Sequence, residues 1–358
     1  MTKSRIFFYF SLAFFIFSRS VSAQENVVIL KEYIFDNAPF LQCHASTIVE
    51  TPDGLLVAWF GGTREGNEDV EIWSSRMIGD RWSVPISIAN GIVSAQKRYP
   101  CWNPVLFLLP DSTLTLYYKV GPSPESWWGV MKRSRDFGKS WSEAIKLPKN
   151  ILGPIKNKPV LIPPDKLICG SSSENDGWKV HFETTSDWGH SWNVTAPPVT
   201  GNFPRVIQPS ILIHSGSILQ AMCRSREGHL MTTWSRDGGQ TWTAFERSEL
   251  PNPNSGIDAV TLSDGIHVIV YNHTTIQSQS RGGPRTPLNV AVSRDGIRWS
   301  AVAVLENEPG EYSYPAVIQA RNGLIHITYT WNRSKIRYVV MNPAAFIPKP
   351  IYEGKWPD

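Results

Sequence analysis

The chain has 358 residues, of which 18% are charged and 41% are hydrophobic, and it contains 15 tryptophans. Its 35 lysines and arginines nearly balance 31 aspartates and glutamates, so the formal net charge is only +4. This composition excludes a disordered chain and a coiled coil. The small net charge also argues against a nucleic-acid partner held by a general basic surface.

The first 23 residues have the pattern of an export signal. Lys3 and Arg5 precede an apolar run over residues 6–17, and small residues follow up to Ala23. The apolar run is too short to span a bilayer comfortably, so we expect cleavage after Ala23 rather than a membrane anchor. The mature protein, residues 24–358, is therefore expected to be secreted or periplasmic.

An oxidising compartment of this kind permits disulfide bonds. Cys43, Cys101, Cys169 and Cys223 allow three different pairings, and the sequence does not choose among them. The alternative is that all four are small buried side chains in tightly packed strands.

Six segments share one pattern and indicate a repeat architecture. Each begins with a polar or aromatic residue, continues with Pro or Ala and an apolar run, and is followed by a turn and a second apolar run. The segments start about 50 to 60 residues apart, which is typical of propeller blades made of several short strands. Their first residues are His44, Asn103, Lys158, Gln208, Asp258 and Tyr314.

A second motif closes most of these units. Segments 134–141, 185–192 and 235–242 share the pattern S/T-x-D-x-G-x-S/T-W, segment 293–299 is one residue shorter, and segment 78–82 is a degraded copy. We expect a hairpin turn in which Asp accepts backbone hydrogen bonds, Gly supplies a positive φ and Trp packs the turn against its blade. Because the motif repeats, we expect its role to be structural.

These boxes, in a six-unit chain with an export signal, resemble the Asp-box (BNR repeat) sialidase superfamily. The resemblance covers nearly all of residues 24–358 and implies an all-β fold, a single six-bladed β-propeller. The sixth unit lacks a box, and we expect the apolar segments 27–30 and 33–35 to supply its outer strand and close the ring. The fold alone does not fix the chemistry.

Residues at the same phase of each repeat converge near the axis of a propeller. All six first residues carry a hydrogen-bonding or ionisable group, which favours a ligand-binding mouth over a structural funnel. Further polar residues follow on the next strand, and a flanking loop contains the aromatic residues Trp127 and Trp128. Tryptophan stacks on sugar faces, amides bind hydroxyls, and Lys or Arg bind carboxylates, so we expect an acidic oligosaccharide as the partner. The expected binding residues are Asn103, Lys158, Gln208, Lys119, Arg224, Arg64, Arg281 and Arg285.

The resemblance also implies roles for single residues. Members of the superfamily bind the substrate carboxylate with three arginines, attack the anomeric carbon with a tyrosine activated by a glutamate, and use an aspartate as acid and base. Tyr314 falls at the position of the nucleophile, Arg224 at the second arginine, and Arg281 or Arg285 at the third. Asp69, in the loop after the first inner hairpin, is the candidate acid/base. The implied activity is that of an exo-acting glycoside hydrolase of the sialidase type.

Two positions depart from the superfamily pattern. His44 stands where the first arginine is expected, and Gln208 stands where the activating glutamate is expected. A tyrosine hydroxyl has a pKa near 10 in water and needs a base or a positive field to act as a nucleophile, and glutamine cannot accept its proton. Asp258, at the same phase one blade later, or Glu311 are candidate substitutes for the missing base.

The altered set is also compatible with other functions. His44 or Tyr314 could remove the C5 proton of a uronate whose carboxylate is bound by Arg224 and Lys158, which describes a lyase. His44 could equally act alone in cleaving a neutral sugar from a uronate. A third reading is a non-catalytic carbohydrate-binding propeller. The eight histidines show no metal-ligand spacing, and we expect neither a metal nor another cofactor.

Overall fold

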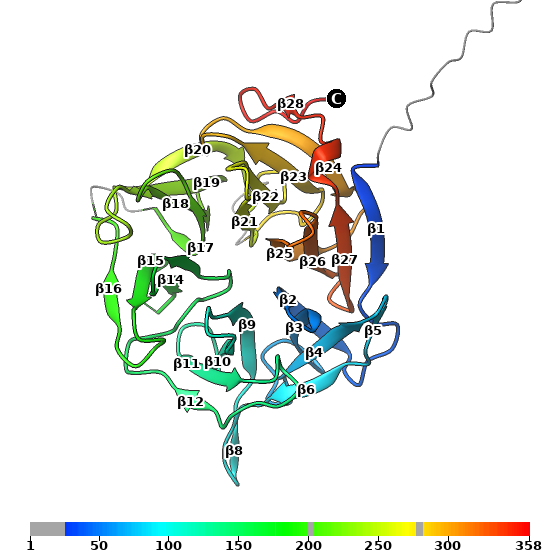
Figure 1. The fold of residues 1–358 in the computed structure, drawn as a ribbon, viewed down its shortest axis with the longest axis vertical. Coiled ribbons are helices and arrows are strands. Elements are labelled where there is room, and N and C mark those ends of the chain that lie inside the picture. The colour runs from blue at the N-terminus through cyan, green and yellow to red at the C-terminus, as the bar shows by residue number, and fades with distance from the viewer. Residues whose placement is uncertain (1–25, 176, 200–203, 277–281) are drawn as a thin grey trace, which may run out of the picture.

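The computed structural model describes residues 26–175, 177–199, 204–276 and 282–358. Six antiparallel sheets stand around a central axis like the blades of a propeller (Figure 1). The fold is thus the expected all-β six-bladed propeller. The expected export signal over residues 1–23 lies outside the described residues, and so does Arg281.

The first three blades follow in chain order. Blade 1 contains β2 (Gln42–Thr51), β3 (Gly54–Gly62), β4 (Glu71–Ile78), β5 (Arg81–Trp82) and β6 (Ile86–Ala89). The two-stranded hairpin of β7 (Ile92–Ser94) and β8 (Lys97–Arg98) precedes blade 2, which contains β9 (Cys101–Leu108), β10 (Leu114–Val120), β11 (Trp128–Ser134) and β12 (Ile145–Lys146). Blade 3 contains β13 (Val160–Ile162), β14 (Lys166–Ser173), β15 (Lys179–Thr185) and β16 (Asn193–Thr195).

The last three blades repeat this order and then close the ring. Blade 4 contains β17 (Val206–Ile213), β18 (Leu219–Ser225), β19 (His229–Ser235) and β20 (Glu246–Pro251). Blade 5 contains β21 (Asp258–Thr261), β22 (His267–Tyr271), β23 (Leu288–Ser293), β24 (Ser300–Glu306) and β28 (Lys349–Pro350). Blade 6 contains β25 (Tyr312–Gln319), β26 (Ile325–Trp331), β27 (Lys335–Met341) and the N-terminal β1 (Val28–Tyr33).

Strand β1 closes the propeller as the sequence predicts. It pairs antiparallel with β27, from Val28 opposite Met341 to Tyr33 opposite Arg337, and the two lie side by side in Figure 1. The outer strand of the last blade therefore comes from the N-terminal end of the fold, which joins blade 1 to blade 6 and covers an edge that would otherwise stay unpaired.

The core lies between neighbouring blades. Leu56 and Ile72 of blade 1 pack in one cluster with Leu106 and Leu116 of blade 2, and all four are at most 2% exposed. Each fully buried aliphatic side chain of this kind stabilises the fold by about 1.5–3 kcal/mol. Because every blade buries both of its faces in this way, the strands read as long apolar runs rather than as simple alternation.

The repeated boxes form the expected turns at the ends of their blades. In the box of blade 4, the carboxylate of Asp237 accepts hydrogen bonds from the Ser235 hydroxyl at 2.8 Å and from the backbone N–H of Thr241 at 2.9 Å. Gly239 has φ +83°, and the buried Trp242 stacks on Phe182 of blade 3 with ring centroids 3.6 Å apart, so it packs the turn against the neighbouring blade as well as its own. These contacts confirm the structural role of the motif.

All four cysteines lie in the described residues, and they are buried and free. They sit in the inner or second strands of four different blades, so the expectation of buried thiols holds and that of disulfides does not. No helix in the described part of the chain is long and apolar enough to cross a membrane.

A β-bulge near the start of the inner strand marks four of the blades. The register shifts between His44 and Thr47 in β2, and equivalent shifts occur in β9, β17 and β25. Each bulge holds one non-glycine residue at positive φ, an arrangement that turns its side chain out of the regular alternation. These residues are Ala45, Asn103, Gln208 and Tyr314.

The bulges correct the sequence-based phase at three positions. Ala45, rather than His44, is the structural equivalent of Gln208 and Tyr314. Lys158 precedes β13, Asp258 begins β21 in regular pairing, and neither residue has a positive φ, so these two side chains are not turned in the same way. Equal spacing of polar residues in the sequence therefore overstated the symmetry of the ring.

Candidate active site

The hydroxyl group of Tyr314 is the centre of a hydrogen-bonded cluster at the axis. It accepts a hydrogen bond from Arg224 Nη1 at 2.9 Å and one from Gln208 Nε2 at 3.1 Å. Arg224 Nη1 also donates to Gln208 Oε1 at 3.2 Å. Because Tyr314 accepts from both partners, its own proton points away from them and remains available. The structure thus brings together three residues that the sequence assigned to one site.

His44 lies against the same tyrosine. The imidazole and phenol ring centroids are 4.2 Å apart, and His44 Nδ1 is 3.0 Å from the hydroxyl oxygen of Thr330. Burial lowers the pKa of His44 well below its usual value, and the charge of Arg333 lowers it further. The ring is therefore uncharged at neutral pH, and the same surroundings make it a weak base.

A second arginine is tied into the cluster through Asn254. Arg224 Nε donates to Asn254 Oδ1 at 3.0 Å, and Arg285 Nη1 donates to the backbone oxygen of Asn254 at 2.8 Å. Burial, together with the charge of Arg224, lowers the pKa of Arg285 to about 10. The Arg285 guanidinium nevertheless stays charged at neutral pH. Of the two arginines expected in this loop, Arg285 belongs to the site, and Arg281 lies outside the described residues.

Lys156 supplies a further positive charge that the sequence analysis missed. Its Nζ lies 5.6 Å from the ring centroid of Tyr314 and donates to the backbone oxygen of Ile257 at 2.8 Å and to that of Pro315. Burial lowers the pKa of this amine to about 7. The repeat pattern assigns the first position of this unit to Lys158, which precedes Pro159, and gives Lys156 no equivalent in the other units.

Arg333 was also missed, because it comes from the turn after β26, where no repeat pattern pointed. Its Nε donates to Glu311 Oε1 at 2.6 Å, and its Nη1 pairs with Glu65. The backbone oxygen of Arg333 accepts a hydrogen bond from the N–H of Cys43, which places the turn beside His44. Glu311, considered as a base for Tyr314, is thus paired with an arginine instead.

Lys158 and Asp258 form a buried pair of their own. Lys158 Nζ lies 2.9 Å from Asp258 Oδ2, which also accepts the N–H of Val317 at 2.8 Å, while Oδ1 accepts the Ser210 hydroxyl at 2.8 Å. Both carboxylate oxygens of Asp258 are therefore engaged in joining blades 3, 4 and 6. No contact joins this pair to Tyr314 in the described residues, and the catalytic role expected for Asp258 stays a prediction without geometric support.

Two other expected binding residues are buried inside the blades. Lys119 is fully buried and donates from Nζ to the backbone oxygen of Pro154 at 2.5 Å, and burial lowers its pKa to about 7. Its strand position matches that of Arg224, since Lys119 pairs with Trp102 as Arg224 pairs with Ile207. Asn103 is 4% exposed at the bulge of β9.

The loop after β3 carries the remaining candidates. Asp69 is exposed, and its two carboxylate oxygens accept the N–H and the hydroxyl of Thr63 at 2.8 and 2.9 Å. Arg64 is exposed in the same loop. No interaction of either side chain with Tyr314 is recorded among the described residues, so their roles remain predictions.

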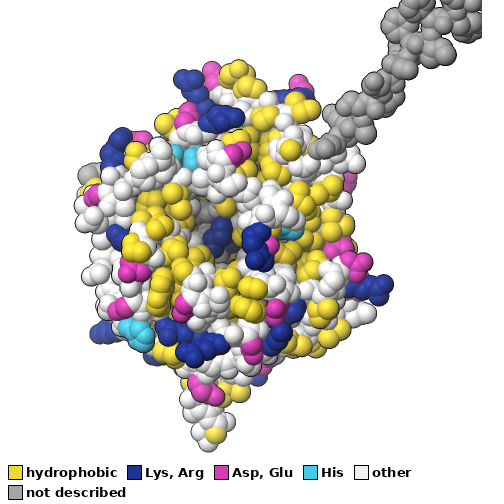
Figure 2. All heavy atoms as spheres, viewed as in Figure 1, with side chains coloured by type: hydrophobic (Ala, Val, Ile, Leu, Met, Phe, Trp, Pro, Cys, Tyr) yellow, Lys and Arg dark blue, Asp and Glu magenta, His cyan; other side chains and the backbone are white. Residues whose placement is uncertain are grey.

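The chemistry of the cluster follows from its charges. Arg224, Arg285 and Lys156 surround a tyrosine hydroxyl and an uncharged imidazole, and Figure 2 shows Lys or Arg side chains in the hollow at the centre of the molecule. Such a site attracts an anionic group and offers a phenol and an imidazole for proton transfer or attack. Among the described residues no three His, Cys, Asp or Glu side chains are grouped so that they could hold a metal ion.

The chain was compared with known families and structures. The model of a family described as BNR repeat-like domain matches residues 53–327, which is most of the chain. No curated protein matches the sequence.

Solved structures with the same fold include proteins of known and unknown function. A protein of unknown function from Dyadobacter fermentans covers 88% of this chain and 98% of its own, with 16% identity and a TM-score of 0.70. The match to the NanB sialidase of Streptococcus pneumoniae covers 90% of this chain and 71% of the sialidase, with 11% identity and a TM-score of 0.69. The match to the intramolecular trans-sialidase of Ruminococcus gnavus covers 89% of this chain and 97% of the trans-sialidase, with 12% identity and a TM-score of 0.68. At these identities the likeness shows the sialidase-like propeller fold alone, and the chemistry has to be inferred from the residues of the site.

Proposed function

The chain belongs to the family of BNR repeat-like domains, and from this premise we propose that it is an exported, exo-acting glycoside hydrolase of the sialidase type that releases a terminal acidic sugar from glycans. One observation carries the proposal: the Tyr314 hydroxyl accepts hydrogen bonds from Arg224 and Gln208 inside a ring of buried cations. A carboxylate-bearing sugar is the ligand that such a ring favours.

In the proposed reaction Tyr314 attacks the anomeric carbon while the glycosidic bond breaks. Asp69 gives its proton to the departing oxygen, and Arg224 with Arg285 binds the sugar carboxylate. A water molecule, activated by the same aspartate, then releases the sugar from the tyrosine. The superfamily uses a glutamate to take the tyrosine proton; here His44 packs against the phenol ring and is not recorded as a hydrogen-bond partner of its hydroxyl, so in this proposal the proton passes to solvent.

The test is a substrate panel. Purified protein is incubated with a fluorogenic sialoside and with oligosaccharides capped by uronates, and released sugars are measured. Release of a terminal acidic sugar that disappears in Tyr314→Phe supports the proposal. Turnover of uronate-capped substrates alone would refute the sialidase label while keeping the acidic-sugar site.

A second candidate is a uronate lyase, which one observation favours. The described contacts of the Tyr314 hydroxyl include no carboxylate, whereas an uncharged imidazole packs against the ring at a tilt of 48°. A Tyr–His pair suits removal of a C5 proton followed by β-elimination. A lyase forms an unsaturated uronate, whose new ultraviolet absorbance separates it from a hydrolase. If sugars bind without any turnover, the chain is a carbohydrate-binding propeller.

A further inference from the structure

We propose that a second carbohydrate subsite lies between blades 2 and 3 and binds a neutral pyranose ring of the glycan chain that carries the acidic sugar. The placement of the acidic sugar at the axis and of the neutral sugar next to it rests on the proposed function. The binding of the neutral ring itself is argued from the residues between these two blades.

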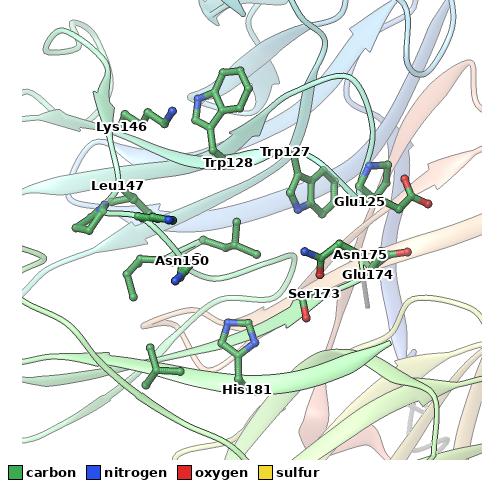
Figure 3. A pocket seen from close by; sticks show the side chains of 16 residues that line it. Glu125, Trp127, Trp128, Lys146, Leu147, Asn150, Ser173, Glu174, Asn175 and His181 are labelled. Carbon is green, nitrogen blue, oxygen red and sulfur yellow. The ribbon is translucent and has the colours of Figure 1, made fainter. Parts of the chain in front are cut away.

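A hollow of about 740 Å³ separates blades 2 and 3, within the range of about 300–1,000 Å³ that is typical of small-ligand sites. It is lined by the loop before β11, the connection after β12, and the facing ends of β14 and β15. Figure 3 shows Glu125, Trp127, Glu174 and Asn175 gathered at one end and His181 reaching in from the strand opposite Trp128.

The hollow opens at the same end of the blades as the central cluster. Its lining residue Ser173 follows Ser172, whose hydroxyl accepts a hydrogen bond from the N–H of Gln208 at 3.2 Å. The Trp178 ring lies 5.3 Å from the guanidinium carbon of Arg224. Burial raises the pKa of Glu174, and the charge of Arg224 partly offsets this rise, so the Glu174 carboxylate lies within electrostatic reach of the central cluster. One glycan chain can therefore reach both places.

The floor of the hollow is held by a buried carboxylate. Glu183 is fully buried and accepts the backbone N–H groups of Leu152 and Gly153 at 2.9 and 2.6 Å. It also lies 2.9 Å from His181 Nε2, which donates to this carboxylate and leaves the second ring nitrogen for a hydrogen bond to a sugar hydroxyl. Glu183 thereby fixes both the loop that lines the hollow and the orientation of the imidazole.

The lining selects a neutral sugar over a second acidic one. Glu125 and Glu174 offer acceptors for sugar hydroxyls, His181 offers a ring nitrogen, and the half-buried Trp128 offers the aromatic surface on which a pyranose ring packs. The Lys146 ammonium lies 4.7 Å above the Trp128 ring and is held there. Glu125 and Glu174 at one end of the hollow repel another carboxylate. Lys146 and Lys149 in the same lining balance their formal charge, so a neutral ring fits here and the acidic sugar belongs at the axis.

Direct binding tests the subsite without relying on catalysis. The full chain is titrated with neutral trisaccharides of galactose, glucose and N-acetylglucosamine while heat and tryptophan fluorescence are recorded. We expect at least one of them to bind, with affinity reduced about 10-fold or more in Trp128→Ala and in Glu125→Gln. Tyr314→Phe should bind it as wild type does. The exposed Glu246 on β20 provides the matched control Glu246→Gln, which should bind normally.

Substrate length supplies the second readout. KM for an acid-capped trisaccharide should rise in Glu125→Gln by about 10-fold relative to KM for an aryl glycoside of the same acidic sugar. Absence of neutral trisaccharide binding, or loss of that binding in Tyr314→Phe but not in Glu125→Gln, overturns the subsite. Binding that depends on Glu125 and Trp128 in a chain that turns over no acidic glycoside would instead refute the proposed function and keep the subsite. Since Glu125 is exposed, its substitution keeps the test valid should Trp128→Ala fold poorly.

Discussion

Arg224 donates a hydrogen bond to the hydroxyl of Tyr314 across 2.9 Å, although the two residues are 90 positions apart and belong to blades 4 and 6. The contact depends on the β-bulge at Tyr314, which holds this residue at positive φ and turns its side chain to the axis. The bulge at Gln208 does the same for the glutamine that bonds to both residues. A repeat fold thus produces an asymmetric site by placing different residues in equivalent bulges.

Replacing Tyr314 by phenylalanine removes the hydroxyl and leaves the ring packed against His44. We expect kcat to fall by about 1,000-fold or more because the attacking or proton-transferring atom is lost. The buried Arg224 keeps its bonds to Gln208 and Asn254, so folding should persist, as judged by circular dichroism. Tyr352, which is 72% exposed, gives the control Tyr352→Phe with unchanged kcat. Wild-type turnover in Tyr314→Phe would remove this residue from the mechanism.

Replacing Gln208 by glutamate restores a carboxylate beside the tyrosine. The side chain already lies 3.1 Å from the Tyr314 hydroxyl and 3.2 Å from Arg224 Nη1, so a carboxylate there can accept the tyrosine proton and pair with the arginine. We expect the hydrolysis rate of a fluorogenic sialoside to rise about 10-fold or more, the lower range of general base catalysis. Gln208→Met, which has similar size and no acceptor for that proton, should show no gain. A fall in both variants would mean that the amide itself binds the substrate.

Lys156 makes substrate binding depend on pH near neutrality. Its pKa in the folded protein is about 7, below the usual value of a lysine, because the amine is buried. It is charged below pH 7 and loses its charge as the pH rises, so the affinity for an anionic sugar should fall above pH 7 by about 10-fold. KM measured from pH 6 to 9 checks this, and the rise should flatten in Lys156→Met but persist in the exposed control Lys349→Met.

The same residue affects stability with a definite sign. Below pH 7 the amine is charged in both the folded and the unfolded chain, and its burial then destabilises the fold. Between about pH 7 and 10 the unfolded chain binds the extra proton, so this cost is relieved as the pH rises. Lys156→Met should therefore raise the melting temperature more at pH 6 than at pH 9. An equal change at both values would contradict a buried, easily neutralised amine.

The repeat pattern could be read from the sequence because it recurs. Blade number, the Asp-box turns and closure by β1 all follow from apolar runs and turn residues that repeat at a fixed period. The central residues Tyr314, Gln208 and Arg224 were predictable for the same reason, since each stands at a defined place in its repeat, whereas Arg285 was named only with Arg281, through the resemblance to the sialidase superfamily. These features required no knowledge of how side chains are turned within a strand.

The remaining site residues depend on backbone details that no repeat signals. Whether an inner strand carries a bulge decides the direction of its first polar side chain. The sequence pattern gives no sign that Ala45 lies in such a bulge and Lys158 does not. Lys156 and Arg333 lie outside the repeating positions and reach the cluster through irregular connections. The hollow between blades 2 and 3 depends on a single buried carboxylate, Glu183, in a strand that otherwise reads as structural.

The Asp-boxes should make the fold sensitive to acid. The Thr241 hydroxyl and the other hydrogen bonds of the turn lower the pKa of Asp237 to about 2. Since the carboxyl group titrates near pH 4 in an unfolded chain, the stabilisation is complete above that pH and is lost as the pH falls toward about 2. We expect Asp237→Asn to lower the melting temperature at pH 7 and the difference from wild type to shrink between pH 4 and pH 2.

The control for this measurement is Asp80→Asn, since the Asp80 side chain is 96% exposed and belongs to the degraded box of blade 1. It should leave the melting temperature unchanged at every pH. Because the proposed catalytic site lies at the axis and the boxes at the ends of the blades, Asp237→Asn should also keep the wild-type KM at temperatures where it is folded. A pH-independent difference between Asp237→Asn and wild type would show that the turn depends on the shape of the side chain and not on its charge.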